Sequence, residues 1–264
     1  IVQDDFCQGR PDWDKLTDTS TRGSSDNHAA VNISFVDDVA PYELMKIRIL
    51  NGGHAALCYP AALLGVNYVH EAVEHPVIGP FLDALQRHEI IPTVPPLPND
   101  DDGNDTSLTN YWSLIQSRFA NPTIQDTITR ICYDGSNRQP KFIVPVAQDL
   151  LSSENSPADH QHRVVDGVAL VSALWCRYCQ GTMETGETIA PNDPQWETLH
   201  PLALQTKEQG DPTLWLQGLR DQVYGAKVGE SPVFIEAFTQ AWYHIDQHGV
   251  ESALRDYIEK HSTN

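Results

Sequence analysis

Two different patterns of apolar and polar positions divide the chain. Residues 31–36 (VNISFV) alternate apolar and polar side chains and are rich in β-branched residues, which predicts a short strand. From Pro41 onward, apolar residues recur at the spacing of a helix face, and Pro41 itself suits a first helical turn. Helices are expected over residues 42–64, 76–87, 109–119, 122–133, 141–151 and 164–179. The pattern predicts a mainly α fold.

Helix boundaries are clearest in the last third of the chain. Asp-Pro at residues 211–212 and Ser-Pro at 231–232 are typical helix starts, and Gly225 and Gly249 are typical helix ends. A last helix is expected over residues 251–261. No period of about 20–50 residues repeats, which argues against a solenoid. The strand at 31–36 has no evident partner later in the chain, so its sheet is expected elsewhere.

Composition and charge narrow the class of protein. The 264 residues are 40% apolar and 20% charged, which is a globular composition. With 17 basic against 36 acidic residues, the net charge of −19 disfavours nucleic-acid binding. No run of about 18 apolar residues predicts a membrane span. Five cysteines, an odd number, and no recognisable leader favour a reducing, cytoplasmic location.

The segment at residues 46–56 (KIRILNGGHAA) carries the most informative chemistry. At about 100° per residue, Asn51 lies about 140° and His54 about 80° around a helix from Lys46, so the three share one polar sector. In a largely buried helix such polar groups cost free energy unless they have partners. A desolvated Lys could act as a general base towards an alcohol, with Asn and His holding the oxygen. The alternative is a surface Lys, a capping Asn and a satisfied core His.

Two consecutive glycines interrupt this helix. Each of Gly52 and Gly53 costs about 1 kcal/mol relative to Ala in a helix interior. What a glycine offers in return is close approach of a ligand or of another backbone. The pair therefore supports a binding site at this point of the chain.

A second basic segment lies at residues 130–141 (RICYDGSNRQPK), where Arg130, Arg138 and Lys141 surround a predicted helix–turn–helix corner. One interpretation is compensation of a helix dipole beside a solvated turn. The other is polyol recognition, because Arg and Lys donate hydrogen bonds in fixed directions to hydroxyl groups. The sequence leaves both open.

Metal and nucleotide motifs are missing. Cys176 and Cys179 have CxxC spacing, but no second CxxC occurs after them, and two thiols on the buried face of a helix are the simpler interpretation. No HxxxH or HExxH occurs, so no metal site is predicted. Neither GxGxxG nor GxxxxGK[ST] occurs, so no phosphate cradle for a dinucleotide is expected in this chain.

Several of these segments together resemble a known family. The pattern DFxxGRPxW at residues 5–13, followed by FVxDVxPYExMKxRxLNxxH at 35–54, resembles the polyol-specific long-chain dehydrogenases, most closely their mannitol-oxidising members. RFANP at residues 118–122, the segment 130–141 and PxF at 232–234 fit the same family. The match extends over nearly the whole chain.

The resemblance covers only the C-terminal half of such enzymes. It implies that residues 1–37 are the tail of an N-terminal Rossmann domain and a linker, and that 38–264 form a multi-helical substrate domain like the C-terminal domain of 6-phosphogluconate dehydrogenase. It further implies NAD or NADP as cofactor, bound mainly by the missing Rossmann domain, a polyol or ketose as substrate, and no metal. The chain alone is expected to have little or no turnover.

The family also implies roles for individual residues. Lys46 matches the general base, Asn51 an oxyanion-hole residue, and His54 a residue that binds and orients the substrate. Arg130 and Arg138 match substrate-binding positions. The expected reaction is the interconversion of mannitol and fructose by hydride transfer.

The sequence leaves other activities open. Fructuronate and tagaturonate reductases and arabinitol dehydrogenases share the base motif. Outside this enzyme class, the alternative is a non-catalytic helical domain that binds a polyol or a partner chain.

Overall fold

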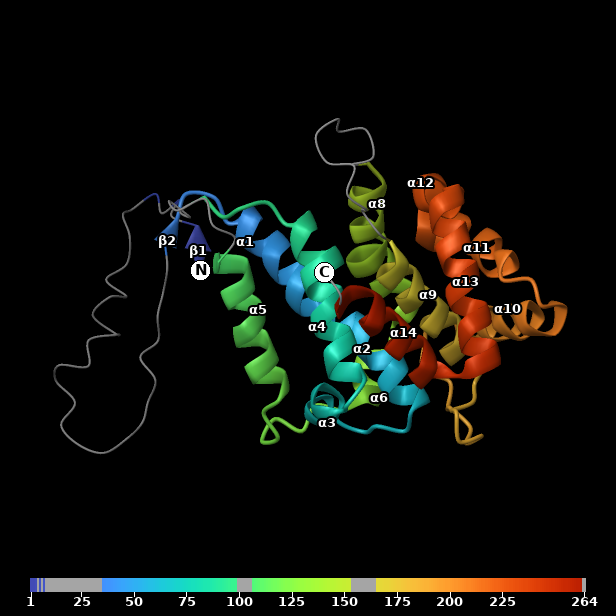
Figure 1. Ribbon diagram of the computed structural model, residues 1–264. Helices are drawn as coiled ribbons and strands as arrows, with labels where there is room; N and C mark the ends of the chain where they lie inside the picture. Colours follow the sequence, from blue (N-terminus) through green and yellow to red (C-terminus); the bar gives the residue numbers. More distant parts are fainter. Residues whose placement is uncertain (4, 6, 8–34, 99–105, 153–164, 263–264) are drawn as a thin grey trace.

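The computed structural model describes residues 1–3, 5, 7, 35–98, 106–152 and 165–262 (Figure 1). Most of the pattern at residues 5–13 and of the expected strand at 31–36 lies outside this range. Helices dominate the described residues, as the sequence predicts. None of these helices combines the length and the apolar character needed to cross a membrane.

The described helical elements are spread over both halves of the chain. The first half contains α1 (Ala40–Met45), the π-helix η3 (Lys46–Asn51), α2 (Gly52–Leu63), α3 (Val69–Glu74), α4 (Ile78–Leu85), the π-helix η4 (Gln86–Ile90), the 3-10 helix η5 (Ile91–Thr93) and α5 (Thr106–Phe119). The second half contains α6 (Ile128–Cys132), α7 (Gly135–Arg138), the π-helix η6 (Gln139–Ile143), α8 (Val144–Ser152), α9 (Asp166–Cys179), α10 (Trp196–Gln209), α11 (Thr213–Gly218), the π-helix η8 (Arg220–Tyr224), α12 (Gly225–Gly229), α13 (Pro232–His248) and α14 (Val250–Ser262).

A two-stranded parallel sheet lies at the N-terminal end of the structure. Strand β1 (Val2–Gln3) pairs with β2 (Phe35–Val36), with Val2 opposite Phe35 and Gln3 opposite Val36. The strand expected to have its sheet elsewhere therefore has a short partner earlier in this chain. This pairing was not predicted, because a strand of two residues carries no periodic pattern.

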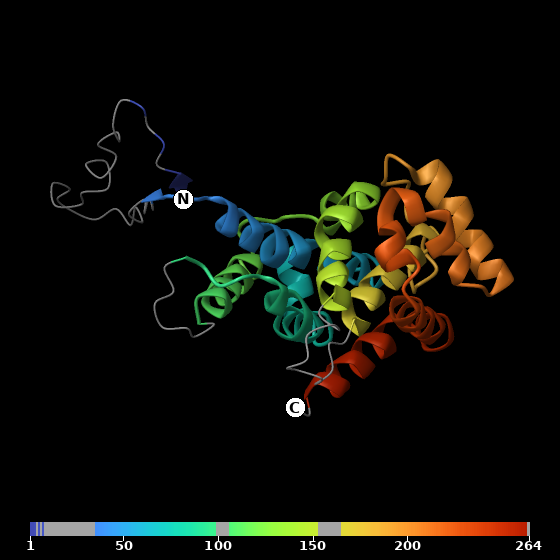
Figure 2. The ribbon, with the colours of Figure 1, turned by 90° about the horizontal axis from the view of Figure 1, so that it is seen from above.

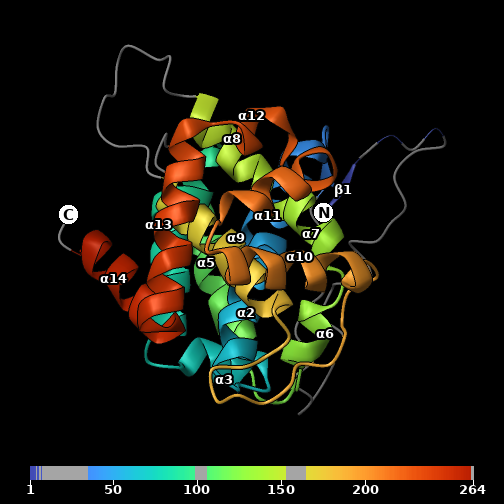
Figure 3. The ribbon, with the colours of Figure 1, turned by 90° about the vertical axis from the view of Figure 1, so that its right-hand side faces the viewer.

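The core forms around two helices that are buried on nearly every side. Helix α2 packs against α6, and α9 packs against α2 and α13. The apolar residues of this core come from segments far apart in the sequence. Trp112, Trp175 and Trp215 are fully buried in it. Figures 1 and 2 show β1, β2 and α1 at one end of the molecule and α10 to α13 at the other, and Figure 3 views the molecule from the second of these ends. The helices around α2 lie between these ends.

Several predicted boundaries are confirmed and others are wrong. Helix α13 begins at Pro232, where Ser231 Oγ accepts a 3.4 Å hydrogen bond from the Phe234 amide, and ends at Gly249, whose φ is +85°. The helix expected over residues 122–133 begins only at Ile128, because Thr127 caps it through the Arg130 amide. Gly225, expected to end a helix, caps the end of η8 with a φ of +65° and is also the first residue of α12.

Candidate functional site

The segment that starts at Lys46 forms a π-helix within one long helix. Residues 40–63 run through α1, η3 and α2 without a break, and the Gly52 amide at the end of η3 donates to the carbonyls of Ile47 and Ile49. A π-turn contains more residues than an α-turn, so a side chain five positions on comes back closer to the first. The angle around the helix axis between the side chains of Lys46 and Asn51 is therefore smaller than the angle of about 140° that a regular α-helix would give.

A polar hollow of about 310 Å³ lies beside the end of this π-helix. Its walls come from the η3–α2 junction on one side and from the α6–α7–η6 corner on the other, two segments that pack against each other. The lining includes Asn51, His54, Arg130, Asp134, Asn137, Arg138 and Lys141. The structure thus brings together four of the five predicted site residues.

The corner between α6 and η6 is held by a tight turn. Asp134 has a left-handed backbone with φ of 71°, a conformation that Asp tolerates better than most residues, and its carbonyl accepts from the amides of Asn137 and Arg138. Ser136 donates through its amide and its hydroxyl to Asp193, at 2.8 and 2.7 Å. A Cβ on Gly135 would overlap the Tyr59 hydroxyl, so only glycine fits there. These contacts fix where Arg138 leaves the backbone.

Arg130 is held by a carboxylate from the preceding turn. Its Nε and Nη2 donate to the two Asp126 oxygens at 2.6 and 2.5 Å, and hydrogen bonding from Arg130 lowers the pKa of the Asp126 carboxyl. A bidentate pair fixes the plane of a guanidinium as well as its position. Asp126 was not among the residues predicted from the sequence, although its spacing of four residues from Arg130 at a helix start was visible.

His54 stands at the wall of the hollow as a neutral ring. Burial lowers its pKa to about 4, with the charges of Arg138 and Arg130 acting in the same direction and that of Asp126 opposing them. The ring stacks on Phe119 with a centroid distance of 4.2 Å and an interplanar angle of 18°. A neutral imidazole at pH 7 can donate one hydrogen bond and accept another. It is suited to orienting a hydroxyl group.

Lys46 lies apart from these residues. It is exposed at the start of η3 and is not among the residues that line the hollow. The described residues therefore do not bury Lys46, although a desolvated lysine is expected from the sequence at this position. The buried cation of this helix is Arg48, whose guanidinium donates to Asp149 at 2.7 Å and to Thr93 at 2.9 Å.

The two glycines after the π-helix have unequal surroundings. A Cβ on Gly52 would meet only ordinary contacts, the nearest being the Phe142 carbonyl at 3.6 Å. A Cβ on Gly53 would lie 3.0 Å from Gln86 Nε2. At Gly53, the group that comes close to the backbone is the buried Gln86 side chain of the protein itself, and not a ligand.

The cysteine pair is buried. Cys176 and Cys179 are free thiols without exposure in α9, and burial raises the pKa of both. Raised thiol pKa values disfavour the thiolate that metal binding and redox chemistry need. Among the described residues, no group of three or more His, Cys, Asp or Glu side chains is arranged to hold a metal ion.

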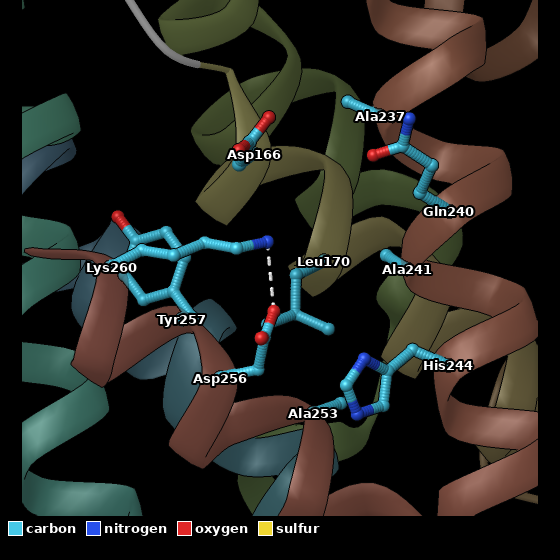
Figure 4. A pocket seen from close by; sticks show the side chains of 10 residues that line it. All are labelled: Asp166, Leu170, Ala237, Gln240, Ala241, His244, Ala253, Asp256, Tyr257 and Lys260. Carbon is cyan, nitrogen blue, oxygen red and sulfur yellow. Dashed lines mark ion pairs between the residues drawn. The ribbon is translucent and has the colours of Figure 1, made fainter.

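A second hollow, of about 270 Å³, lies between α9, α13 and α14 (Figure 4). It is lined by small apolar residues and by polar side chains that include Asp166, Gln240 and His244. Lys260 crosses its edge and pairs with Asp256 at 2.8 Å. None of the residues predicted from the sequence lines this hollow, whose parts come from three separate helices.

The family is identified by comparison with known proteins. Residues 38–246 match the sequence model of the mannitol dehydrogenase C-terminal domain. The chain is 41% identical over 258 residues to mannitol 2-dehydrogenase of Cereibacter sphaeroides, covering 98% of this chain and 47% of that protein. It is 29% identical over 259 residues to mannitol 2-dehydrogenase of Aspergillus niger, covering 98% of this chain and 47% of that protein.

Solved structures agree with the sequence comparison. The ternary complex of Pseudomonas fluorescens mannitol 2-dehydrogenase with NAD and D-mannitol superimposes with a TM-score of 0.77 at 32% identity, over 98% of this chain and 46% of that one. A D-sorbitol dehydrogenase in substrate-free form has the same fold, with a TM-score of 0.71 at 23% identity over 96% of this chain and 45% of that one. The chain thus spans about half the length of the relatives it matches. It belongs to the mannitol dehydrogenase family and corresponds to the C-terminal domain of its members.

Proposed function

We propose that this chain is the substrate-binding and proton-accepting part of an NAD-dependent mannitol 2-dehydrogenase that interconverts mannitol and fructose. One observation carries the proposal: Asn51, His54, Arg130 and Arg138 line a single polar hollow in a chain of the mannitol dehydrogenase family. Each of these side chains can exchange hydrogen bonds with hydroxyl groups. The named relatives and the complex with NAD and D-mannitol support the choice of substrate and cofactor.

Three residues of the long helix would carry the proton chemistry. Lys46 removes the proton from the reacting hydroxyl, and the Asn51 amide donates to the oxygen as negative charge develops on it. Neutral His54 orients that hydroxyl by donating or accepting a hydrogen bond. Lys46 is exposed in this chain, so we propose that the part of the enzyme carrying the cofactor desolvates it on closing against this face.

The basic residues of the corner would recognise the remaining hydroxyls. Arg130 is fixed by Asp126 and presents its other guanidinium protons, and Arg138 donates from the neighbouring turn.

The dinucleotide would be held outside the described residues of this chain. The sequence has no glycine-rich phosphate cradle, and we propose that residues 1–37 are the tail of a dinucleotide-binding domain and a linker, with 38–264 as the substrate domain. When bound, the nicotinamide supplies the hydride acceptor. Five free thiols and a net charge of −19 support a cytoplasmic enzyme that binds neither nucleic acid nor a membrane.

A fused enzyme tests the proposal. The N-terminal part of the Cereibacter sphaeroides enzyme, which lies outside the match, would be joined to this chain, and mannitol-dependent reduction of NAD would be measured. We expect activity that falls about 10²–10⁴-fold in Lys46→Met, the range for loss of a general base. The matched control is Lys141→Met, which removes a cation from the rim of the hollow and should cost far less. Equal losses in both variants would contradict the role of Lys46.

A further inference from the structure

A buried amide on another element contacts the π-helix from behind. Gln86, the first residue of η4, is fully buried, and its Nε2 donates a 2.8 Å hydrogen bond to the carbonyl of Ile49. The two residues are 37 positions apart in sequence. Gln86 is not among the residues that line the polar hollow. It can act on the site only through the backbone of η3.

The carbonyl that Gln86 holds lies at the centre of the candidate site. Ile49 stands between Lys46 and Asn51 in the π-helix. The Gly52 amide is shared between the carbonyls of Ile47 and Ile49, as is common where a helix changes its turn width. A shared donor satisfies each acceptor less fully, and Gln86 supplies a second donor to one of them. This bond favours the wide turn over a regular α-turn.

Gly53 makes room for this amide. A Cβ at residue 53 would lie 3.0 Å from Gln86 Nε2 and 3.6 Å from Phe119, the ring on which His54 stacks. The neighbouring Gly52 has no comparably close contact. The sequence alone left the reason for the second glycine open.

We infer that Gln86 is a positioning residue that holds the π-turn and so sets the directions of Lys46 and Asn51. The inference rests on the proposed function for the roles of those two residues. Gln86 is buried and does not line the polar hollow, so the proposed role is to position other residues. A regular α-turn at residues 46–51 would rotate Asn51 away from the direction of Lys46. Proton transfer and oxygen stabilisation would then be separated.

The first test uses this chain alone and measures amide hydrogen exchange by NMR. Gln86→Leu should change the exchange rate of the Gly52 amide by at least about tenfold, because this amide would exchange its shared acceptors, the carbonyls of Ile47 and Ile49, for the Arg48 carbonyl of a regular α-turn. The matched control is Thr206→Val, which removes a 2.8 Å bond from a buried side chain to the Leu202 carbonyl in α10. That control should leave Gly52 unchanged. Unchanged Gly52 exchange in folded Gln86→Leu would overturn the inference.

The second test uses the fused enzyme and separates kcat from KM. Gln86→Leu should lower kcat by up to about 10²-fold, the cost of a small misplacement of reacting groups, with KM changed much less. Thr206→Val should change neither. A Gln86→Leu enzyme with the wild-type kcat would overturn the inference.

The isosteric Gln86→Glu variant adds a pH readout. Burial raises the pKa of the new carboxyl, so at low pH its O–H can donate to the Ile49 carbonyl, and at high pH the ionised group cannot. The ratio of its kcat to that of the wild type should therefore fall as pH rises, and a constant ratio would overturn the inference. An inactive wild-type fused enzyme would instead overturn the proposed function, and with it the catalytic part of this inference, while the exchange result would be unaffected.

Discussion

At the scale of single residues, the site depends on which side chains are charged. The hollow contains Arg130, Arg138 and Lys141, yet the imidazole among them is neutral because burial lowers the pKa of His54 to about 4. A protonated His54 would add a fourth positive charge beside these cations. A neutral ring stacked on Phe119 avoids that repulsion and keeps one donor and one acceptor for hydroxyl groups.

NMR titration of this chain tests the charge of His54. The ring should stay neutral as pH falls from 8 to 5 and reach half-protonation near pH 4, because the folded state disfavours the charged form. The His54→Gln variant identifies its resonance. Because the pKa of His54 is lower in the folded chain than in the unfolded one, the unfolded chain binds a proton at higher pH. This residue therefore lowers the free energy of unfolding as pH falls from about 6.5 towards 4. A midpoint between pH 6 and 7 would contradict this description of the site.

At the scale of the elements, wide helical turns shape the site. The π-helix η3 carries Lys46 and Asn51, η4 carries Gln86, and η6 carries Lys141. Helix η3 contacts both η4 and η6. The sequence predicted a helix over all of η3 and over parts of η4 and η6. It could not predict the wide turns, because a π-turn here depends on a distant donor such as Gln86 and not on a local pattern of apolar residues.

The same distinction applies to the other predicted elements. Helix α13 was predictable because Ser231, Pro232 and Gly249 mark its ends locally. The candidate residues Lys46, Asn51, His54, Arg130 and Arg138 were singled out from the polar sector of one helix and from the basic segment 130–141, and a family resemblance supplied their expected roles. Phe119 and Gln86, which support them, were not found, because their roles arise only when α5 and η4 pack against α2.

A pair of glycine substitutions tests the element packing. Gly135→Ala should destabilise the chain by about 1–3 kcal/mol, because its Cβ would overlap the Tyr59 hydroxyl and lie 2.5 Å from Trp175 Nε1. Gly52→Ala should instead be neutral or stabilise by about 0.5–1 kcal/mol, since it removes backbone entropy and meets only ordinary contacts. Urea unfolding measures both. Equal effects of the two changes would show that the helix contacts are wrongly assigned.

At the scale of the whole molecule, one buried carboxyl group joins three distant segments. Glu89 in η4 accepts hydrogen bonds from the amides of Gly167 and Val168, at 2.6 and 2.9 Å, and from the Tyr257 hydroxyl at 2.8 Å. It thereby links the start of α9 to α14. Burial raises the pKa of Glu89 to about 8, against the opposing effect of these donors.

This carboxyl should make stability depend on pH. Because the pKa of Glu89 is higher in the folded chain than in the unfolded one, its contribution is complete below about pH 4.5 and is lost as pH rises through about 8. Glu89→Gln should reduce the decline in the free energy of unfolding between pH 5 and 8.5, measured with urea. Parallel pH curves for the two proteins would contradict the raised pKa.

The proposed function depends most on the face of the molecule that carries Lys46. The chain spans about half the length of its relatives, and the proposed base is exposed on it while the residues proposed to bind substrate line the neighbouring hollow. The central claim is that the amine of Lys46 takes the proton from the substrate hydroxyl. A missing side-chain amine can be replaced by a small amine in solution if proton transfer is its role.

The most direct test is amine rescue of Lys46→Ala in the fused enzyme. We predict that methylamine and ethylamine restore mannitol oxidation in proportion to their concentration, and that amines of higher pKa restore more per molecule of free base. Lys141→Ala should show no such rescue. Mannitol oxidation by Lys46→Ala at the wild-type rate without added amine would contradict this role of Lys46. A loss of activity that no added amine reduces would contradict it as well.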